Sequence, residues 1–158
     1  MILSLLISLS FAIQKGDHLP NVSALNEAGK MISLADYANE KYVLVYFYPK
    51  ADSPGCTAQA CSLRDAYSKL QKDKVVILGV STDSVDDQAK FKKKYRLPFM
   101  LLSDHKEEVA KAFDVPVHFG FTSRQTFLFK EGNLVWLDRS ASTEKQAKDV
   151  MEFLEKQK

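Results

Sequence analysis

Cysteine is scarce in this sequence, with only Cys56 and Cys61 among 158 residues. Two cysteines are too few for a disulfide-stabilised scaffold and too few for a four-thiolate zinc site. Histidine is equally scarce, and the three that occur show no metal-ligand spacing: His18, His105 and His118. We therefore expect neither a metal site nor a bound cofactor.

An excess of charge of either sign is also lacking. The chain has 22 basic and 20 acidic residues, which gives a formal net charge of +2. The densest basic run, residues 92–94, ends a helix-like segment, where cations complement the helix dipole. This balance gives no indication of a nucleic-acid partner.

The first twelve residues, MILSLLISLSFA, carry no charged side chain. The run is shorter than the ~20 residues of a membrane span and has the length of the hydrophobic region of a signal peptide. A first strand or an extension packed on the domain is the alternative. We expect residues 1–14 to be a candidate signal peptide, with export to a periplasmic or extracytoplasmic space if it is cleaved and a cytoplasmic location otherwise.

Residues 15–158 contain no linker, repeat or low-complexity stretch, so they are expected to form one domain. Strand-like and helix-like patterns alternate along them. The order predicts an α/β domain with a central mixed β-sheet flanked by helices, and it fits a thioredoxin-like fold. The expected strands cover two short runs within 21–34, then 41–48, 74–82, 99–104 and a hairpin over 125–138, and the expected helices cover 33–40, 56–73, 84–95, 106–114 and 142–158.

The loop between the first long strand and the first long helix ends in Ser53, Pro54, Gly55 and Cys56. Proline and glycine favour a tight loop there and allow the backbone to approach a bound molecule. Cys56 is expected in the first helical turn, where free backbone N–H groups and the helix dipole stabilise a thiolate, which is the nucleophilic form. The alternative is an inert buried cysteine.

Cys61 follows Cys56 by five positions. Five residues of α-helix give a rise of about 7.5 Å and a rotation of about 140°. The two Cα atoms of an intact helix would then lie roughly 8 to 9 Å apart, beyond the ~7 Å limit for a disulfide. Either the two thiols never pair, or they pair after local unwinding of the helix.

The stretch FYPKADSPGCTAQACSLRD closely resembles the active-site segment of the peroxiredoxins. Their signature P-x-x-x-[T/S]-x-x-C is matched by Pro49, Ser53 and Cys56. The further pattern C-T-x-Q-A-C, here CTAQAC, is similar to the peroxiredoxin Q or bacterioferritin comigratory protein subfamily. The resemblance continues through VVILGVSTDS, FMLLSD and SRQTFLF, and it covers residues 15 to about 158.

The resemblance implies a thiol peroxidase. Cys56 would be the peroxidatic cysteine that becomes a sulfenic acid, and Cys61 the resolving cysteine that forms an intramolecular disulfide with it. Thioredoxin or a similar dithiol donor would then reduce the disulfide. If the leader is cleaved, that donor would have to be extracytoplasmic. Because both cysteines belong to one chain, a monomer is expected.

Further positions gain roles from the same resemblance. Pro49 would shield the thiolate from water, Ser53 would hold the thiolate and the peroxide oxygen, and Gly55 would contribute to substrate binding. Arg124 would stabilise the thiolate and the charge on the leaving oxygen, with Gln59 orienting it. From the residues alone, a surface salt bridge to Asp or Glu is the favoured interpretation of Arg124.

Two other functions remain open from the sequence. A thioredoxin-like thiol–disulfide oxidoreductase is disfavoured by the lack of a C-x-x-C motif. A redox-sensing binding module could use the same two thiols to report oxidation to a partner.

The leader hypothesis leads to a direct prediction. N-terminal sequencing of the mature protein is expected to start beyond residues 1–12, because the apolar run ends in the small residue that a cleavage site requires. If the mature protein retains Met1, cleavage is excluded and the expected location is the cytoplasm.

Overall fold

The computed structural model describes residues 12–158, so most of the expected leader, residues 1–11, lies outside the described residues. The strands are β1 (Ser23–Asn26), β2 (Met31–Ser33), β3 (Tyr42–Phe47), β4 (Val75–Ser81), β5 (Met100–Ser103), β6 (Val117–His118), β7 (Phe121–Thr122), β8 (Gln125–Lys130) and β9 (Asn133–Asp138). The helices are the 3-10 helix η1 (Leu34–Tyr37), α1 (Pro54–Asp65), α2 (Tyr67–Lys72), α3 (Val85–Tyr95), α4 (Glu108–Ala112) and α5 (Gln146–Glu155).

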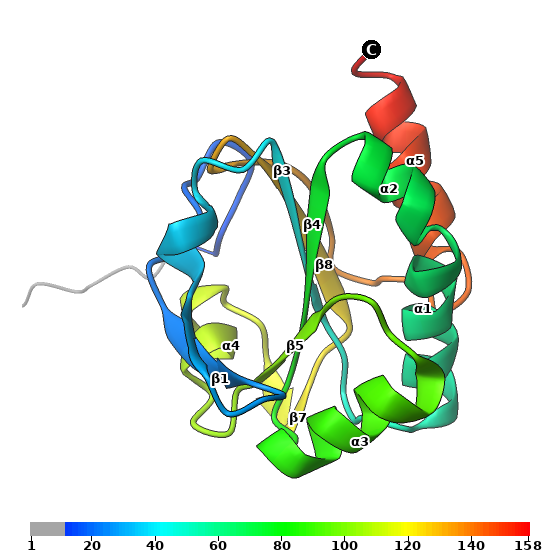
Figure 1. Ribbon diagram of the computed structural model, residues 1–158. Helices are drawn as coiled ribbons and strands as arrows, with labels where there is room; N and C mark the ends of the chain where they lie inside the picture. The colour runs from blue at the N-terminus through cyan, green and yellow to red at the C-terminus, as the bar shows by residue number, and fades with distance from the viewer. Residues whose placement is uncertain (1–11) are drawn as a thin grey trace, which may run out of the picture.

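Seven strands form one sheet in the order β2-β1-β5-β4-β3-β8-β9 (Figure 1). The three central strands β3, β4 and β5 run parallel, and the pairings of β8 with β3, β9 with β8, β1 with β5 and β2 with β1 are antiparallel. The predicted α/β architecture with a central mixed sheet is thus confirmed.

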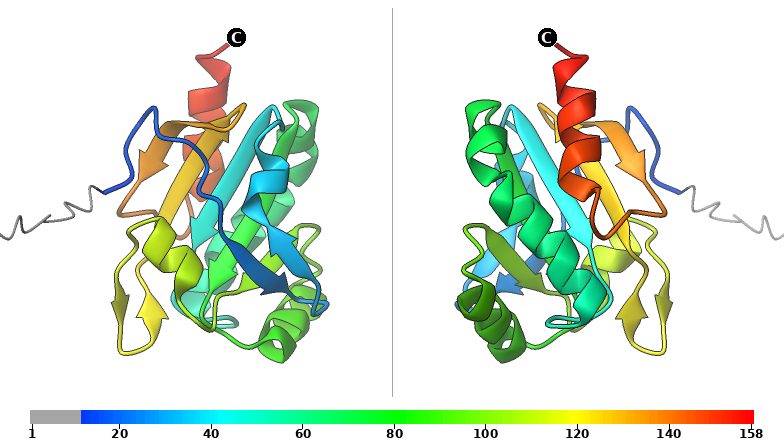
Figure 2. Two further views of the ribbon diagram at one scale, coloured as in Figure 1. Left: turned by 90° about the vertical axis from the view of Figure 1, so that its left-hand side faces the viewer. Right: turned by 90° about the vertical axis from the view of Figure 1, so that its right-hand side faces the viewer.

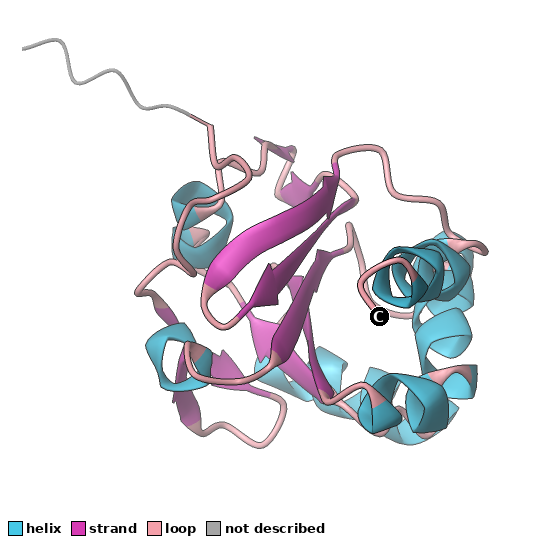
Figure 3. Ribbon diagram, turned by 90° about the horizontal axis from the view of Figure 1, so that it is seen from above, coloured by secondary structure: helices cyan, strands magenta, loops and turns pink. Residues whose placement is uncertain are grey.

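Both faces of the sheet are covered by helices (Figures 1 and 3). All six residues of β3 are buried, as its uninterrupted apolar sequence predicts for a strand with two covered faces. Leu44 and Tyr46 pack with α1, α2, α3 and α5, while Val43 and Val45 pack with η1 and α4. The strand period of two therefore divides the core into two layers.

The helix expected over residues 56–73 is two helices. It begins earlier, because Ser53 takes the N-cap position and Pro54 the first helical position, which suits its fixed φ. It is broken at Ala66, whose φ of −91° and ψ of 0° depart from helical values. The last helix begins at Gln146 rather than at 142, and the short β6–β7 hairpin was not predicted.

The described chain starts as part of the folded body. Ile13 is buried, and its carbonyl accepts a 2.7 Å hydrogen bond from Arg139. The Gly16 N–H donates to the Leu134 carbonyl of β9 at 2.9 Å. Across residues 12–158, no helix combines the length and apolar character that crossing a membrane requires.

Two stacked tyrosines beneath α1 give a prediction about stability. Tyr46 and Tyr48 are both fully buried, and burial raises the pKa of Tyr46 and of Tyr48. The Tyr48 hydroxyl donates to Gln88, whereas the Tyr46 hydroxyl has no partner among the described residues. Tyr46→Phe should therefore raise the free energy of unfolding by about 1 kcal/mol, measured by urea denaturation.

The matched control is Tyr48→Phe, which removes the same atom from a neighbouring ring but leaves the Gln88 amide oxygen without its donor. It should lower the free energy of unfolding by about 1 kcal/mol. Equal losses in the two variants would contradict the prediction.

Candidate active site

The candidate site lies at the edge of the sheet where β3 and β4 end. Because β8 runs antiparallel to β3, its first residue, Gln125, pairs with the last residue of β3, Phe47. Segments distant in sequence are thereby brought together: the loop that follows β3 and Arg124, which precedes β8. Thr126 pairs with Tyr46, so its side chain points to the face that α1 covers.

Cys56 is the third residue of α1 and therefore lies in its first turn, as predicted. The thiol is 1% exposed. Backbone N–H groups of a first turn have no partners within the helix and, with the positive end of the dipole, are placed to stabilise negative charge that develops beside them. A buried thiol at this position is expected to be more reactive than an inert core cysteine if a positively charged side chain also lies beside it.

Arg124 supplies that positive neighbour. Its Nη2 lies 3.4 Å from the Cys56 Sγ, and its Nη1 donates a 2.5 Å hydrogen bond to the Gln59 Oε1. Within residues 12–158 the hydrogen bonds of its side chain go to these two residues rather than to a carboxylate. The structure thus brings together three of the residues that the sequence analysis selected.

Gly55 leaves the space that the guanidinium occupies. A Cβ at this position would lie 3.2 Å from the Arg124 Nη2 and 3.3 Å from the Thr143 Cγ2. Both distances are tighter than ordinary carbon contacts. With any larger residue between Pro54 and Cys56, Arg124 or Thr143 would have to shift by a few tenths of an ångström from the start of α1.

Among the described residues, neither Ser53 nor Pro49 forms a hydrogen bond with the Cys56 thiol. The Ser53 hydroxyl donates a 2.8 Å hydrogen bond to the Lys50 carbonyl, and its described hydrogen bonds do not include Cys56. Pro49 is half-buried directly after Tyr48. To hold peroxide, the Ser53 hydroxyl would have to form a hydrogen bond with a peroxide oxygen. It could do so by accepting a hydrogen bond from the peroxide, or by rotating away from the Lys50 carbonyl and donating to it.

The loop that carries these residues is fastened to α3. The carboxylate of Asp83 accepts a 2.8 Å hydrogen bond from the Ala51 N–H. Asp52 has a positive φ of 60° and accepts from Lys94 at 2.8 Å and from the Tyr95 hydroxyl at 2.6 Å. These two hydrogen bonds lower the pKa of Asp52, so it stays charged and the attachment persists at neutral pH.

Behind Gln59 lie two buried residues that were not predicted from the sequence, Gln146 and Thr126. Gln59 donates from Nε2 to the Gln146 Oε1 at 2.6 Å, and the Thr126 hydroxyl donates to the same oxygen at 2.7 Å. Gln146 stands at the start of α5, which packs alongside α1 (Figure 2). The sequence does contain an indication that Gln146 is buried, because its position in the helix places it beside the apolar stripe formed by Ala147, Val150 and Leu154.

Cys61 lies in the same intact helix as Cys56, half-buried, and both thiols are unpaired. The helix therefore has the spacing that prevents a bridge in this conformation. A Cys56–Cys61 disulfide requires the turn that contains both residues to unwind.

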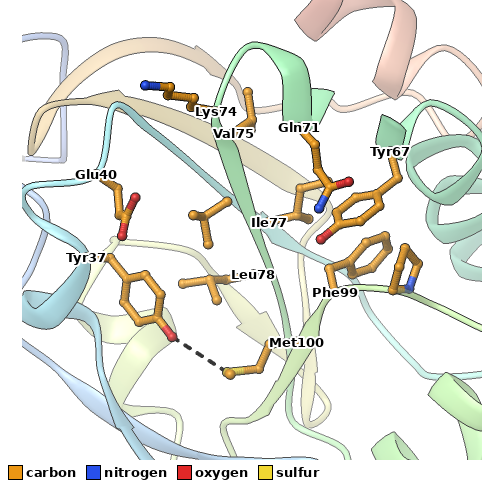
Figure 4. Close-up of a pocket in the computed structure, with 12 residues that line it drawn as sticks. Tyr37, Glu40, Tyr67, Gln71, Lys74, Val75, Ile77, Leu78, Phe99 and Met100 are labelled. Carbon is orange, nitrogen blue, oxygen red and sulfur yellow. Dashed lines mark hydrogen bonds between the residues drawn. The ribbon is translucent and has the colours of Figure 1, made fainter. Parts of the chain in front are cut away.

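A cavity of about 410 Å³ lies toward the opposite edge of the sheet, where β4 begins (Figure 4). It is lined by Tyr37 and Met100 on one side and by Tyr67 and Phe99 on the other. No cysteine lines it. Over residues 12–158 no cluster of three or more potential metal-ligating side chains occurs either. Within residues 12–158, Cys56 is the cysteine whose thiol has a hydrogen-bonded cationic side chain beside it.

Known proteins resemble this chain over most of its length. The model of the AhpC/TSA family matches residues 15–137. Peroxiredoxin Bcp of Bacillus subtilis (strain 168) is 41% identical over 131 residues, covering 78% of this chain and 83% of the relative. The chloroplastic peroxiredoxin Q of Oryza sativa subsp. japonica is 40% identical over 125 residues, and 57% of its length is spanned.

Solved structures show the same fold. The crystal structure of peroxidoxin BcpB from Mycobacterium tuberculosis superposes with a TM-score of 0.86 at 28% identity, covering 92% of this chain and 99% of that one. A structure of the bacterioferritin comigratory protein of Xanthomonas campestris, described for its alkyl peroxide reduction activity, has a TM-score of 0.82 at 28% identity, with 93% and 99% covered. The thioredoxin-like fold expected from the order of elements is thus confirmed.

Gly55→Ala tests whether the position of Arg124 matters for the thiol. The added methyl should displace the guanidinium from Cys56 and slow the reaction of Cys56 with peroxide by about tenfold or more. The free energy of unfolding should stay within about 1 kcal/mol of the parent, because alanine favours helix over glycine. Stopped-flow oxidation and urea denaturation measure the two quantities.

Thr143→Ser is the control, since it removes the other atom close to a Cβ at position 55 without affecting Arg124. It should leave the peroxide rate unchanged and should not rescue Gly55→Ala. A parental rate in Gly55→Ala would show that the contact is dispensable.

Proposed function

The chain belongs to the AhpC/TSA family as a peroxiredoxin of the Bcp and peroxiredoxin Q group, and we propose that it reduces hydrogen peroxide and organic hydroperoxides through Cys56. The observation that carries the proposal is the contact of the Arg124 guanidinium with a buried thiol in the first turn of α1. The reported alkyl peroxide reduction by the Xanthomonas relative supports the inclusion of organic hydroperoxides.

In the first step the Cys56 thiolate attacks the terminal oxygen of the peroxide. A sulfur–oxygen bond forms as the oxygen–oxygen bond breaks, and the electron pair of that bond leaves on the second oxygen. Arg124, fixed beside the sulfur, is placed to stabilise the negative charge on both the thiolate and the leaving oxygen. The leaving oxygen takes up a proton and departs as water or alcohol, and Cys56 is left as a sulfenic acid.

In the second step Cys61 condenses with the sulfenic acid. The sulfur–sulfur bond forms as the sulfenic hydroxyl leaves as water, and no further oxidant is consumed. Because both thiols belong to α1, its first turns must unwind for this step. A dithiol donor then reduces the Cys56–Cys61 disulfide to two thiols and is itself oxidised to a disulfide.

We propose thioredoxin as that donor in a cytoplasmic setting and an extracytoplasmic dithiol protein if residues 1–14 are removed by export. An intramolecular disulfide needs only one chain, which supports a monomer as the working unit. Residues 1–11 of the candidate leader lie outside the described structure, whereas Ile13 is buried in the folded body, so the N-terminal sequence of the mature protein decides whether and where cleavage occurs.

The competing functions make different use of the same thiols. A thiol–disulfide oxidoreductase would require neither a buried nucleophile nor an arginine beside it, and a sensor would require a single oxidation but no repeated turnover. The geometry at Cys56 favours peroxidase chemistry, since the guanidinium is placed where charge develops on the leaving oxygen.

Cysteine variants give the decisive test. Stopped-flow mixing of the reduced protein with hydrogen peroxide should show rapid loss of one thiol, then loss of the second without formation of a covalent dimer. Cys61→Ser should show the first phase but no turnover with a dithiol donor, because the sulfenic acid cannot resolve. Cys56→Ser should show neither phase.

A rate comparable to that of free cysteine would refute the peroxidase proposal. Sustained turnover in Cys61→Ser would show that the resolving role belongs elsewhere. A normal oxidation phase in the parent protein without turnover on any dithiol donor would favour the sensor.

A further inference from the structure

The buried side chains behind Arg124 form a chain of hydrogen bonds with a fixed direction. The guanidinium has only donors, so the Gln59 oxygen must accept from it and the Gln59 NH₂ must donate onward. The Gln146 oxygen must therefore accept, and the Thr126 hydroxyl donates to that same oxygen. Gln59, Gln146 and Thr126 are each fully buried, so these hydrogen bonds are shielded from bulk water, and among the described residues the Gln146 Nε2 has no partner.

Gln59 occupies a special place in this chain because it lies between the two cysteines. A Cys56–Cys61 disulfide requires unwinding of the segment that contains Gln59, as the helical spacing dictates. Unwinding removes the acceptor of Arg124 and one donor to Gln146 in the same motion. The hydrogen bonds that hold Arg124 in place thus also hold the first turns of α1 closed.

The rest of α1 has its own attachment to the segment before α5. The Ser62 hydroxyl, one residue beyond Cys61, donates to the Glu144 carbonyl and accepts from the Ala147 N–H, both at 3.4 Å. Neither bond involves a residue between Cys56 and Cys61. Unwinding can therefore be confined to the first two turns of α1, while the remainder stays docked on α5.

We propose that Gln146 is a positioning residue that acts through Gln59, both to hold Arg124 against Cys56 and to oppose the opening of α1. This inference rests on the proposed peroxidase function. According to this proposal, Gln146 influences which of two reactions the Cys56 sulfenic acid undergoes, further oxidation or disulfide formation. In the closed helix the sulfenic acid stays near Arg124, where a second peroxide can oxidise it to sulfinic acid with release of water or alcohol. In the opened helix it condenses with Cys61 and releases water.

Gln146→Met tests the proposal, since methionine has a similar length but no hydrogen-bonding amide. The rate of Cys56 oxidation should fall about fivefold, because Gln59 no longer has its acceptor and Arg124 is held less firmly. The rate of disulfide formation should rise by a similar factor of about five, because opening breaks one buried hydrogen bond fewer. The fraction of sulfinic acid at high peroxide should fall accordingly.

Quenched-flow trapping followed by mass spectrometry separates thiol, sulfenic acid, disulfide and sulfinic acid in the full-length protein. Gln146→Glu keeps an acceptor oxygen at the same place and should restore both rates toward the parent. Gln157→Met makes the same substitution at an exposed residue beyond α5 and should change neither rate. Opposite shifts of the two rates, with rescue by Glu, would not arise from simple loss of packing.

Thr126→Val provides a second route in case Gln146→Met does not fold. It removes the other donor to the Gln146 oxygen with little change of shape and should shift both rates in the same directions, by a smaller factor. Parental rates in the folded Gln146→Met or Thr126→Val variants, or failure of Gln146→Glu to rescue, would overturn the proposal. A parent protein without a fast oxidation phase would instead refute the peroxidase function itself.

Discussion

The contact of Arg124 with Cys56 is the interaction on which the rest of the site depends. A thiol that is 1% exposed lacks the water that would solvate a thiolate, so the first turn of α1 and the guanidinium must replace that solvation. The surrounding structure serves this contact: Gly55 leaves room for the guanidinium, Gln59 fixes its second nitrogen, and the antiparallel register of β8 with β3 delivers it to the edge where α1 begins.

Two separate sets of hydrogen bonds support the two sides of the thiol. The loop before α1 is attached to α3 and β4 through Asp52 and Asp83, and these bonds involve no residue between the cysteines. The helix side is attached through Gln59 to Gln146 at the start of α5. In the proposed cycle, opening of α1 would break the second set and leave the first in place, so the loop would still be positioned when the disulfide is reduced.

The sequence predicts best those features of the structure that are local. The buried strand β3, the helix expected over 84–95 and the position of Cys56 in a first helical turn follow from hydrophobic pattern, helix-forming residues and loop composition, and each is confirmed. The sequence did not predict the break at Ala66, and it placed the start of the last helix at residue 142 instead of Gln146. In both places the local sequence does not mark the helix boundary, and tertiary packing determines it. Arg124 entered through family resemblance, since by itself a single arginine before a strand indicates no partner.

The sequence by itself determined that one segment carries a cysteine at a helix start and a second thiol too far along that helix to pair with it at rest. These conclusions follow from helix geometry, which depends on a few consecutive residues. Only the tertiary structure decided what surrounds the thiol. Arg124 reaches Cys56 across 68 residues and Gln146 reaches Gln59 across 87, and such meetings are set by strand register and helix packing rather than by any local pattern.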